Sequence, residues 1–179
     1  MNKFQEKFNK EVQPKMMEEF GYTNKMAVPK IDKVTINAGL SAASKSQTFL
    51  EDATRDLRFI AGQAPVITKA KKAISGFKIR QGQDVGIMVT LRGKKMWDFL
   101  YRLVAAAIPR TKDFQGIDKK NFDGQGNLSL GIKEQLIFPE IKSDDIDTIF
   151  GFQVNVTNTA ANKEEGIRLF KLLGFPIKE

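Results

Sequence analysis

Four stretches of the sequence alternate apolar residues with glycine, methionine or polar residues, which is the pattern of a strand with one covered face. They occupy residues 33–37, 85–92, 128–133 and 152–157, and a short apolar run at 66–68 is a further candidate strand. Because most of the alternate positions are polar, one face of the resulting sheet should stay open to solvent. Antiparallel sheets have this arrangement far more often than parallel sheets, which are buried on both faces.

The first twenty residues place apolar side chains at intervals of four, which is the spacing of one helix face. The members of this stripe are Phe4, Phe8, Val12 and Met16. We therefore predict an N-terminal helix over residues 1–20, with Pro14 as an unexpected interruption.

A second helix is predicted over residues 49–60, whose apolar residues also repeat at helical spacing. Ser41 or Ser44 is a candidate N-cap for this helix. Gly62 supplies the left-handed residue that should end it.

Two more helices are predicted in the remaining sequence. One covers residues 96–107 and should end at Pro109, which cannot donate a backbone hydrogen bond. The other begins near Asn162, because Asn162 and Glu165 have the spacing of a capping box ahead of the apolar residues at 167–173.

These elements indicate an α+β fold with an antiparallel sheet of about four to five strands and helices packed mainly on one face. The length of 179 residues fits a single domain spanning residues 1–179. Two segments lack any period. Residues 69–82 form a basic loop that is either mobile or an extended ribbon, and residues 110–127 are irregular with three glycines. Phe138-Pro139 should break the strand at 128–133.

Positive charge is concentrated in the middle of the chain. Lysine and arginine number 29 against 21 acids, a net charge of +8. Residues 65–112 hold eleven cations and two acids, a local net charge of +9, so the rest of the chain sums to −1. Such a concentration indicates a polyanionic partner, although solvated surface lysines are the alternative.

The composition argues against catalysis. The chain has no cysteine and no histidine, which removes thiol nucleophiles, thiolate zinc sites and the commonest general base. Asp144, Asp145 and Asp147 could bind magnesium, but their spacing lacks the glycine and final glutamate of a calcium loop, so a solvated acidic loop is the favoured interpretation. Gly124-Gln125-Gly126 lacks the third glycine of a dinucleotide fingerprint and is interpreted as a flexible loop. We expect no enzymatic activity, cofactor, metal or small-molecule substrate.

No targeting or membrane segment is recognisable. The longest apolar run has six residues, at 103–108, whereas a membrane helix needs about 20. Residues 1–10 lack the apolar core of a signal peptide. We expect a cytoplasmic protein with no membrane partner.

The polar positions of the predicted strands suit an RNA helix. Short hydrogen-bonding groups lie beside cations there, without the exposed aromatic pair that stacks unpaired bases in RNA-recognition motifs. Such a face can bind 2′-hydroxyls and base edges across a shallow minor groove. The alternative is that these are ordinary solvent-facing residues. The candidate residues are Lys33, Thr35, Asn37, Thr90 and Arg92.

Phe77 lies in the basic loop between Gly76 and Lys78. An exposed ring there could pack on a ribose or a base, and it could equally fold back onto the sheet. The sequence leaves both positions open.

At these residues the chain strongly resembles the bacterial-type ribosomal protein L5 family, whose members bind 5S rRNA in the large subunit. The resemblance rests on six blocks that occur in family order over nearly all of the chain. They are Gly62-Gln63 with Pro65 and Ile67-Thr68-Lys69-Ala70; Gly76-Phe77-Lys78-Ile79-Arg80-Gln81-Gly82; Val89-Thr90-Leu91-Arg92-Gly93 with Met96-Trp97; Pro109-Arg110 with Asp113-Phe114; Phe122-Asp123-Gly124; and Phe138-Pro139-Glu140-Ile141.

The resemblance implies a non-enzymatic RNA-binding protein of the central protuberance, with 5S rRNA and 23S rRNA as partners. It places the 5S rRNA contact on the sheet and the turns beside it. The resemblance implies Lys33, Asn37, Gln63 and Thr90 for this contact, and the strand pattern adds Thr35 and Arg92 to the predicted site.

Two further contacts follow from the resemblance. A basic loop is implied to reach P-site tRNA through Lys71, Lys72, Ser75, Gly76, Phe77, Lys78 and Arg80. A later loop, together with an acidic segment, is implied to bridge to a protein of the small-subunit head, beside neighbouring large-subunit proteins. The bridge residues would be Arg110, Lys112, Asp113, Phe114, Asp144 and Asp145.

Three positions depart from the family pattern. Ser41 stands where a second glycine is common, and Ala64 and Gln115 stand where relatives often carry a cation. Each departure puts one turn or contact in question.

The rival function is a general RNA-binding chaperone without a fixed partner.

Overall fold

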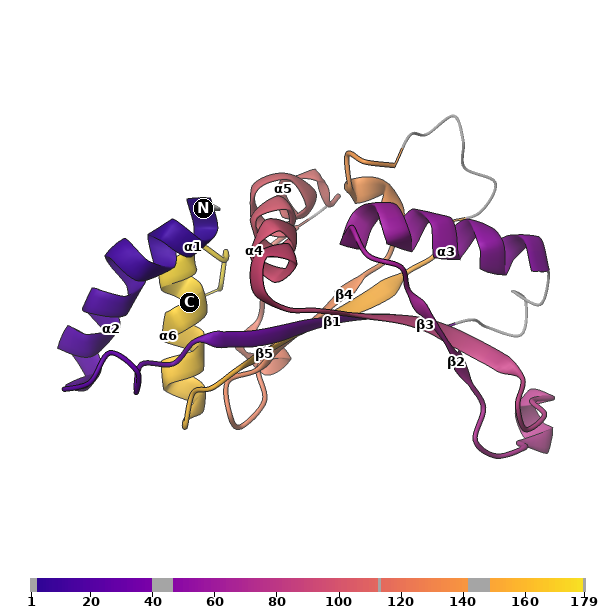
Figure 1. The fold of residues 1–179 in the computed structure, drawn as a ribbon, viewed down its shortest axis with the longest axis horizontal. Helices are drawn as coiled ribbons and strands as arrows, with labels where there is room; N and C mark the ends of the chain where they lie inside the picture. The colour runs from indigo at the N-terminus through magenta and orange to yellow at the C-terminus, as the bar shows by residue number, and fades with distance from the viewer. Residues whose placement is uncertain (1–2, 40–46, 113, 142–148, 179) are drawn as a thin grey trace.

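A five-stranded antiparallel sheet organises the protein. The computed structural model describes residues 3–39, 47–112, 114–141 and 149–178. Within these ranges the strand order is β2-β3-β1-β5-β4, with β1 at the centre (Figure 1). Every pair of neighbours is antiparallel, which confirms the predicted fold class. The strands are β1 (Ile31–Gly39), β2 (Val66–Lys69), β3 (Asp84–Leu91), β4 (Leu128–Ile132) and β5 (Phe152–Asn158).

Helices cover one side of this sheet. α3 (Gln47–Ala61) and α4 (Gly93–Arg102) lie on the same side, and α6 (Lys163–Leu173) packs with the N-terminal helices near the start of β1 (Figure 1). The N-terminal run consists of α1 (Lys3–Lys7), a π-helical turn (Phe8–Val12) and α2 (Gln13–Phe20). The predicted apolar stripe of this run is buried throughout.

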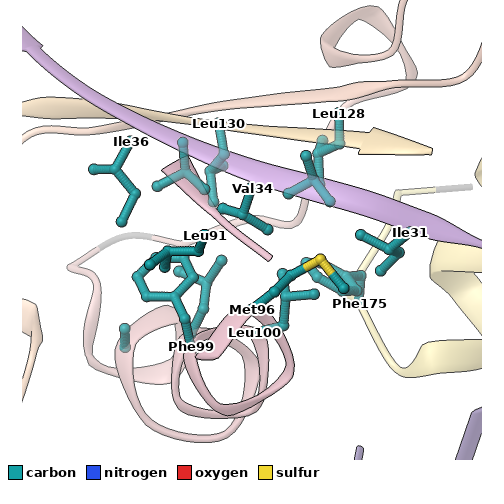
Figure 2. Close-up of a cluster of buried hydrophobic side chains, with 14 of the residues drawn as sticks. Ile31, Val34, Ile36, Leu91, Met96, Phe99, Leu100, Leu128, Leu130 and Phe175 are labelled. Carbon is teal, nitrogen blue, oxygen red and sulfur yellow. The ribbon is translucent and has the colours of Figure 1, made fainter. Parts of the chain in front are cut away.

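The core fills the space between the sheet and α4. Val34 and Ile36 of β1 are fully buried, and they face the buried side chains of Phe99 and Leu100 on α4 (Figure 2). Burial of each such side chain stabilises the fold by about 1.5–3 kcal/mol. The alternation of the strands therefore fixes which face the helices cover.

Pro14 and Pro109 each follow a π-helical turn. The prediction that Pro109 ends its helix is wrong, because the chain continues from α4 through a π-turn (Leu103–Ala107) into α5 (Ile108–Arg110). Pro109 occupies the first turn of α5, as Pro14 does in α2. Proline is tolerated there because the wider turn before it already interrupts the regular ladder of N–H donors.

The strand break at Phe138-Pro139 is also wrongly placed. β4 ends at Ile132, and a short 3₁₀ helix (Gln135–Ile137) intervenes. Phe138 is fully buried and stacks on Phe99 with ring centroids 5.9 Å apart. Core packing rather than backbone termination thus accounts for this residue.

The start and end of α6 agree in part with the prediction from the sequence. Asn162 is the N-cap, but its side chain makes no capping hydrogen bond to the helix. Glu165 instead accepts a 3.1 Å hydrogen bond from the N–H of Ala161. Gly174 ends the helix with a φ of 105°, which glycine adopts without strain. The candidate caps of α3, Ser41 and Ser44, lie outside the described residues.

Of the two forms considered for residues 69–82, the structure has the extended ribbon. The N–H of Ala70 donates to the carbonyl of Gln83 at 2.8 Å, and the N–H of Gly82 donates to Ala70 at 2.9 Å. An antiparallel bridge between Ile74 and Ile79 continues the pairing, and a 3₁₀ turn (Ser75–Phe77) closes it. The segment is a hairpin that extends β2 and β3 beyond the sheet (Figure 1).

The loop at 124–126 is held in place rather than flexible. The Asp123 carboxylate accepts hydrogen bonds from the N–H groups of Gln125 and Asn127, at 3.0 and 2.8 Å, and from the Asn127 side chain at 2.8 Å. Desolvation opposes ionisation of Asp123, but these hydrogen bonds outweigh it and lower the pKa of the carboxyl. The turn is thus fixed by its own first residue.

Two glycines let this turn lie against α6. Gly126 has a φ of 76°, and a Cβ atom on it would come within 2.7 Å of the Cα of Gly166. The Asn158 side chain is buried beside them and donates a 2.5 Å hydrogen bond to the carbonyl of Gly126. Glycine is required at this contact both for conformation and for space.

Gly126→Ala should destabilise the protein by more than about 2 kcal/mol, because it combines left-handed strain with a backbone clash. Gly124→Ala is the matched control, since a Cβ there meets nothing within 4 Å, and it should change stability by less than about 0.5 kcal/mol. Urea unfolding measures both. Equal effects of the two substitutions would contradict the proposed close contact.

A buried carboxyl joins α3 to the segment before β5. Asp56 is 6% exposed and lies 3.5 Å from Arg55, measured from carboxylate oxygen to Nε. Burial raises the pKa of Asp56, although Arg55 and a hydrogen bond with the Gln135 side chain oppose the shift. Gln135 is fully buried, and its side-chain oxygen accepts a hydrogen bond from the N–H of Phe150 at 2.9 Å.

Asp56→Asn should stabilise the protein near neutral pH. A raised pKa means that the folded state holds the proton more tightly, so the wild type loses stability as pH rises from the unfolded pKa through the folded one. Asparagine does not titrate, and the advantage of the variant should therefore grow across that window and then level off. Urea unfolding at several pH values measures it, and an advantage that is independent of pH would contradict the assignment.

Candidate nucleic-acid interface

The open face of the sheet brings the predicted polar residues into cross-strand rows. Thr35 is paired with Thr90 of β3 and with Asn155 of β5. Asn37 is paired with Met88 on one side and with Gln153 on the other. None of these side chains is buried, whereas the residues that alternate with them are. We call this surface the open face, defined by Lys33, Thr35, Asn37, Thr90, Gln153 and Asn155.

Gln63 joins the open face from the turn between α3 and β2. Its side-chain nitrogen donates a 3.3 Å hydrogen bond to the carbonyl of Thr90. The turn is possible because Gly62 ends α3 with a φ of 64°. The structure therefore brings Gln63 beside Thr90, although 27 residues separate them in sequence.

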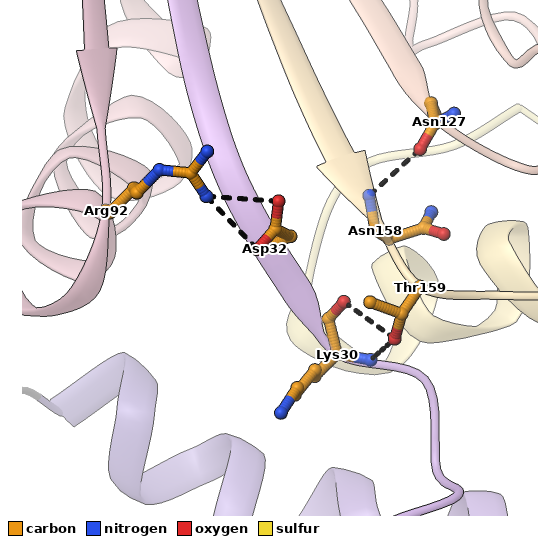
Figure 3. A network of polar contacts seen from close by, with 6 residues as sticks. All are labelled: Lys30, Asp32, Arg92, Asn127, Asn158 and Thr159. Carbon is orange, nitrogen blue, oxygen red and sulfur yellow. Dashed lines mark hydrogen bonds and ion pairs between the residues drawn. The ribbon is translucent and has the colours of Figure 1, made fainter.

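Two cations lie at the end of the open face near the start of β1. Lys33 is half-buried and is paired with Thr157 of β5. Arg92 follows β3 and donates two hydrogen bonds to the Asp32 carboxylate, at 3.1 and 3.2 Å (Figure 3). The sequence prediction placed Arg92 on this face without its acidic partner.

Sequence reasoning did not assign three polar residues of β4 and β5 to the site. Gln153 and Asn155 lie in the same rows as Asn37 and Thr35, and Ser129 of β4 is paired with Asn155. Their alternation with apolar residues was visible in the sequence. What was missing was the strand order, which places β5 directly beside β1.

The β2–β3 hairpin carries the candidate tRNA-contact residues at a distance from these rows (Figure 1). Phe77 is 68% exposed, which decides between its two possible positions: the ring does not fold back onto the sheet. Lys78 has a left-handed backbone, with a φ of 54°, and turns the chain at the tip. All the predicted residues of this group are exposed: Lys71, Lys72, Ser75, Gly76, Phe77, Lys78 and Arg80.

The predicted bridge residues are only partly described. Arg110 and Lys112 are exposed at and just after the end of α5. Phe114 is half-buried and packs against the core, so its ring serves folding at least in part. Asp113, Asp144 and Asp145 lie outside the described residues, as do Ser41 and Asp147.

Glu140, at the start of the predicted acidic segment, is half-buried and paired with an arginine. Arg102 of α4 donates a short hydrogen bond to its carboxylate. The same guanidinium donates a 2.8 Å hydrogen bond to the carbonyl of Ile60 at the end of α3. This arginine therefore connects three segments of the fold.

Two kinds of feature are absent from the described residues. Across 3–39, 47–112, 114–141 and 149–178, no three acids come together in a group that could hold a metal ion. In the same ranges no helix is both long enough and apolar enough to cross a membrane.

Two family models match the chain. The model described as "Ribosomal protein L5" covers residues 24–80, and the model of the C-terminus of the same ribosomal protein family covers residues 84–177. The first spans β1 to the hairpin, and the second spans the remaining strands of the sheet. Together they include every residue of the open face and every candidate tRNA-contact residue of the hairpin.

Curated proteins similar to the chain carry the name "Large ribosomal subunit protein uL5". The protein of Geotalea daltonii is 51% identical over 178 residues, 99% of each chain. That of Microcystis aeruginosa is 53% identical over 171 residues, 96% of each chain. That of Dictyoglomus turgidum is 49% identical over 179 residues, the full length of both. On this similarity, the chain belongs to the ribosomal protein L5 family, which is a family of structural and not enzymatic proteins.

Proposed function

We propose that the protein is a structural constituent of the large ribosomal subunit that anchors 5S rRNA through the open face of its sheet. The observation that carries the proposal is the pair of rows in which Thr35, Asn37 and Thr90 meet Gln153 and Asn155 across three strands. A sheet places these groups at fixed spacing, so they form a hydrogen-bonding surface that Met88 borders on β3. Members of the family are named as large-subunit proteins, which supports the setting.

The chemistry of the open face suits a structured RNA. Hydroxyl and amide groups both donate and accept, and can therefore bind 2′-hydroxyls and base edges. No aromatic residue lies in the two cross-strand rows, so stacking of unpaired bases is not the basis of recognition. A rigid surface that recognises the shape of an RNA helix suits an RNA that stays bound.

Cations around this face supply the electrostatic part of the affinity. Lys33 lies within it and Arg92 borders it, and Lys94 and Lys95 are exposed just after Arg92, in the first turn of α4. Phosphate contacts fix the register of a nucleic acid, whereas hydrogen bonds to sugars and bases supply selectivity. Affinity should therefore fall with salt, while the preference for one RNA should persist.

The β2–β3 hairpin is proposed to contact P-site tRNA. It extends beyond the sheet and presents Lys72, Lys78 and Arg80 to solvent together with the exposed ring of Phe77. Cations on a narrow two-stranded element can follow a phosphate backbone, and the ring can pack on a ribose or a base. This contact would be separate from the one on the open face.

A third contact is proposed for the segment after α5. Arg110 and Lys112, with the acids Asp113, Asp144 and Asp145, would form a bridge to a protein of the small-subunit head. Charges of both signs suit a contact between proteins that shifts as the subunits move, because complementary charges guide association without a large apolar area. Contacts with 23S rRNA and with neighbouring large-subunit proteins belong to the same proposal.

A salt-series titration tests the main proposal. The protein is titrated against 5S rRNA, with tRNA and an unrelated RNA duplex as competitors. Binding of 5S rRNA that survives an excess of both competitors at physiological salt would support a dedicated ribosomal component. Equal affinity for all three RNAs would overturn the proposal and favour the general RNA chaperone.

Mutations should affect the two proposed RNA contacts independently. Asn37→Ala should weaken binding to isolated 5S rRNA, because Asn37 lies in the centre of the open face. Lys72→Ala and Arg80→Ala should leave that affinity nearly unchanged and should impair tRNA handling by assembled ribosomes. Lys119→Ala, at another exposed lysine, is the control for loss of one charge. An equal loss of 5S affinity in all the variants would contradict this division.

Thr90→Val should weaken 5S binding by about 1–3 kcal/mol, because it would leave a polar group of the RNA unpaired at the interface. Valine keeps the shape of threonine and suits a strand, so the fold should persist. Thr48→Val on α3 is the control, since Thr48 is exposed away from the open face. Unchanged affinity for the Thr90 variant would remove this residue from the site.

A further inference from the structure

A β-bulge at the start of β1 turns an acidic residue onto the open side of the sheet. The register pairs Ile31 with Asn158 and Lys33 with Thr157, so β1 advances by two residues while β5 advances by one. Asp32 is the extra residue. A bulge of this kind redirects a side chain that regular alternation would send to the opposite face.

Burial along β1 agrees with this geometry. Ile31 and Val34 both point into the core, where they are 5% and 0% exposed. Two residues, Asp32 and Lys33, stand between them instead of the single residue of a regular strand, and neither is buried. Counted back from Val34, regular alternation would send Asp32 to the helix side; with the bulge, Asp32 lies on the open side and accepts from Arg92.

The ion pair that results uses one end of the Arg92 guanidinium. Both hydrogen bonds to Asp32 come from Nη1, at 3.2 Å to Oδ1 and 3.1 Å to Oδ2 (Figure 3). Nε and Nη2 have no hydrogen-bond partner within the part of the chain that the structure describes. These two nitrogens form the edge with which arginine binds a pair of acceptors.

We infer that Asp32 is a positioning residue for RNA selectivity: it holds Arg92 so that the Nε–Nη2 edge binds a matched pair of acceptor atoms on the RNA. The inference rests on the proposed 5S rRNA contact and adds a specificity determinant to it. The acceptor pair is either two oxygens of one phosphate or O6 and N7 of a guanine. In a regular RNA helix the guanine edge lies in the deep and narrow groove, so a guanine would have to be in a loop or bulge.

The Asp32 carboxylate affects RNA binding by Arg92 in two ways. It orders the arginine before binding, which reduces the conformational entropy lost in the complex. It also cancels one positive charge at the edge of the open face, which weakens the sequence-independent attraction to all RNAs alike. The first effect raises the preference for the matched RNA, and the second lowers total affinity without changing that preference.

The test compares dissociation constants for 5S rRNA and for an unrelated RNA duplex at physiological salt. Asp32→Asn should strengthen duplex binding and should lower the 5S preference by about five-fold. Arg92→Lys keeps the charge but loses the two-nitrogen edge, and it should lower the preference at least as much. Adding Asp32→Asn to Arg92→Lys should lower it no further. Asp118→Asn removes an exposed acid elsewhere and should leave the preference unchanged.

The outcomes separate this inference from the proposed function. A wild-type protein without preference for 5S rRNA would overturn both. A wild-type preference that Asp32→Asn leaves unchanged, or lowers by the same factor in the Arg92→Lys background, would overturn the role of Asp32 alone. A 5S transcript made with 7-deazaguanine then distinguishes the acceptors: it should abolish the Arg92-dependent preference if guanine N7 is bound and preserve it if phosphate is bound.

Discussion

Burial of one face of the antiparallel sheet is the constraint on which the rest of the structure depends. The helices pack on the side to which Val34, Ile36 and their neighbours point, and the hydrophobic effect holds every strand in a single register. A shift by one residue would exchange the two faces completely. The positions of Thr35, Asn37 and Thr90 on the open face are therefore fixed by the core beneath them, and the proposed RNA surface is as rigid as the fold.

Short-range patterns in the sequence carried much of this information. Alternation located β1, β3, β4 and β5, and helical spacing located the buried stripe from Phe4 to Met16. The same rules failed at Pro109, because a π-turn before the proline depends on packing that no local pattern reports. They also failed at Phe138, whose stacking on Phe99 joins two segments far apart in the sequence.

Features that depend on strand order could not be predicted from the sequence. The polar residues Gln153 and Asn155 became part of the site only because β5 lies beside β1. The bulge at Asp32 is a property of the pairing between two strands rather than of either strand alone. The resemblance to the family supplied Gln63, which strand periodicity could not assign because it lies in a turn; its hydrogen bond to Thr90 now gives it a structural reason.

The molecule has two distinct candidate surfaces: the open face of the sheet and the extended basic β2–β3 hairpin. In the proposed function, hydroxyls and amides on the sheet provide selectivity, and the exposed lysines and arginine of the hairpin extend the contact and add positive charge. The most direct test is NMR mapping of side-chain amide and methyl signals during titration with 5S rRNA. The account predicts that the largest changes occur at Thr35, Asn37, Gln63, Thr90 and Asn155. Changes confined to the hairpin tip or to the outer surface of α3, with the open face unaffected, would contradict it.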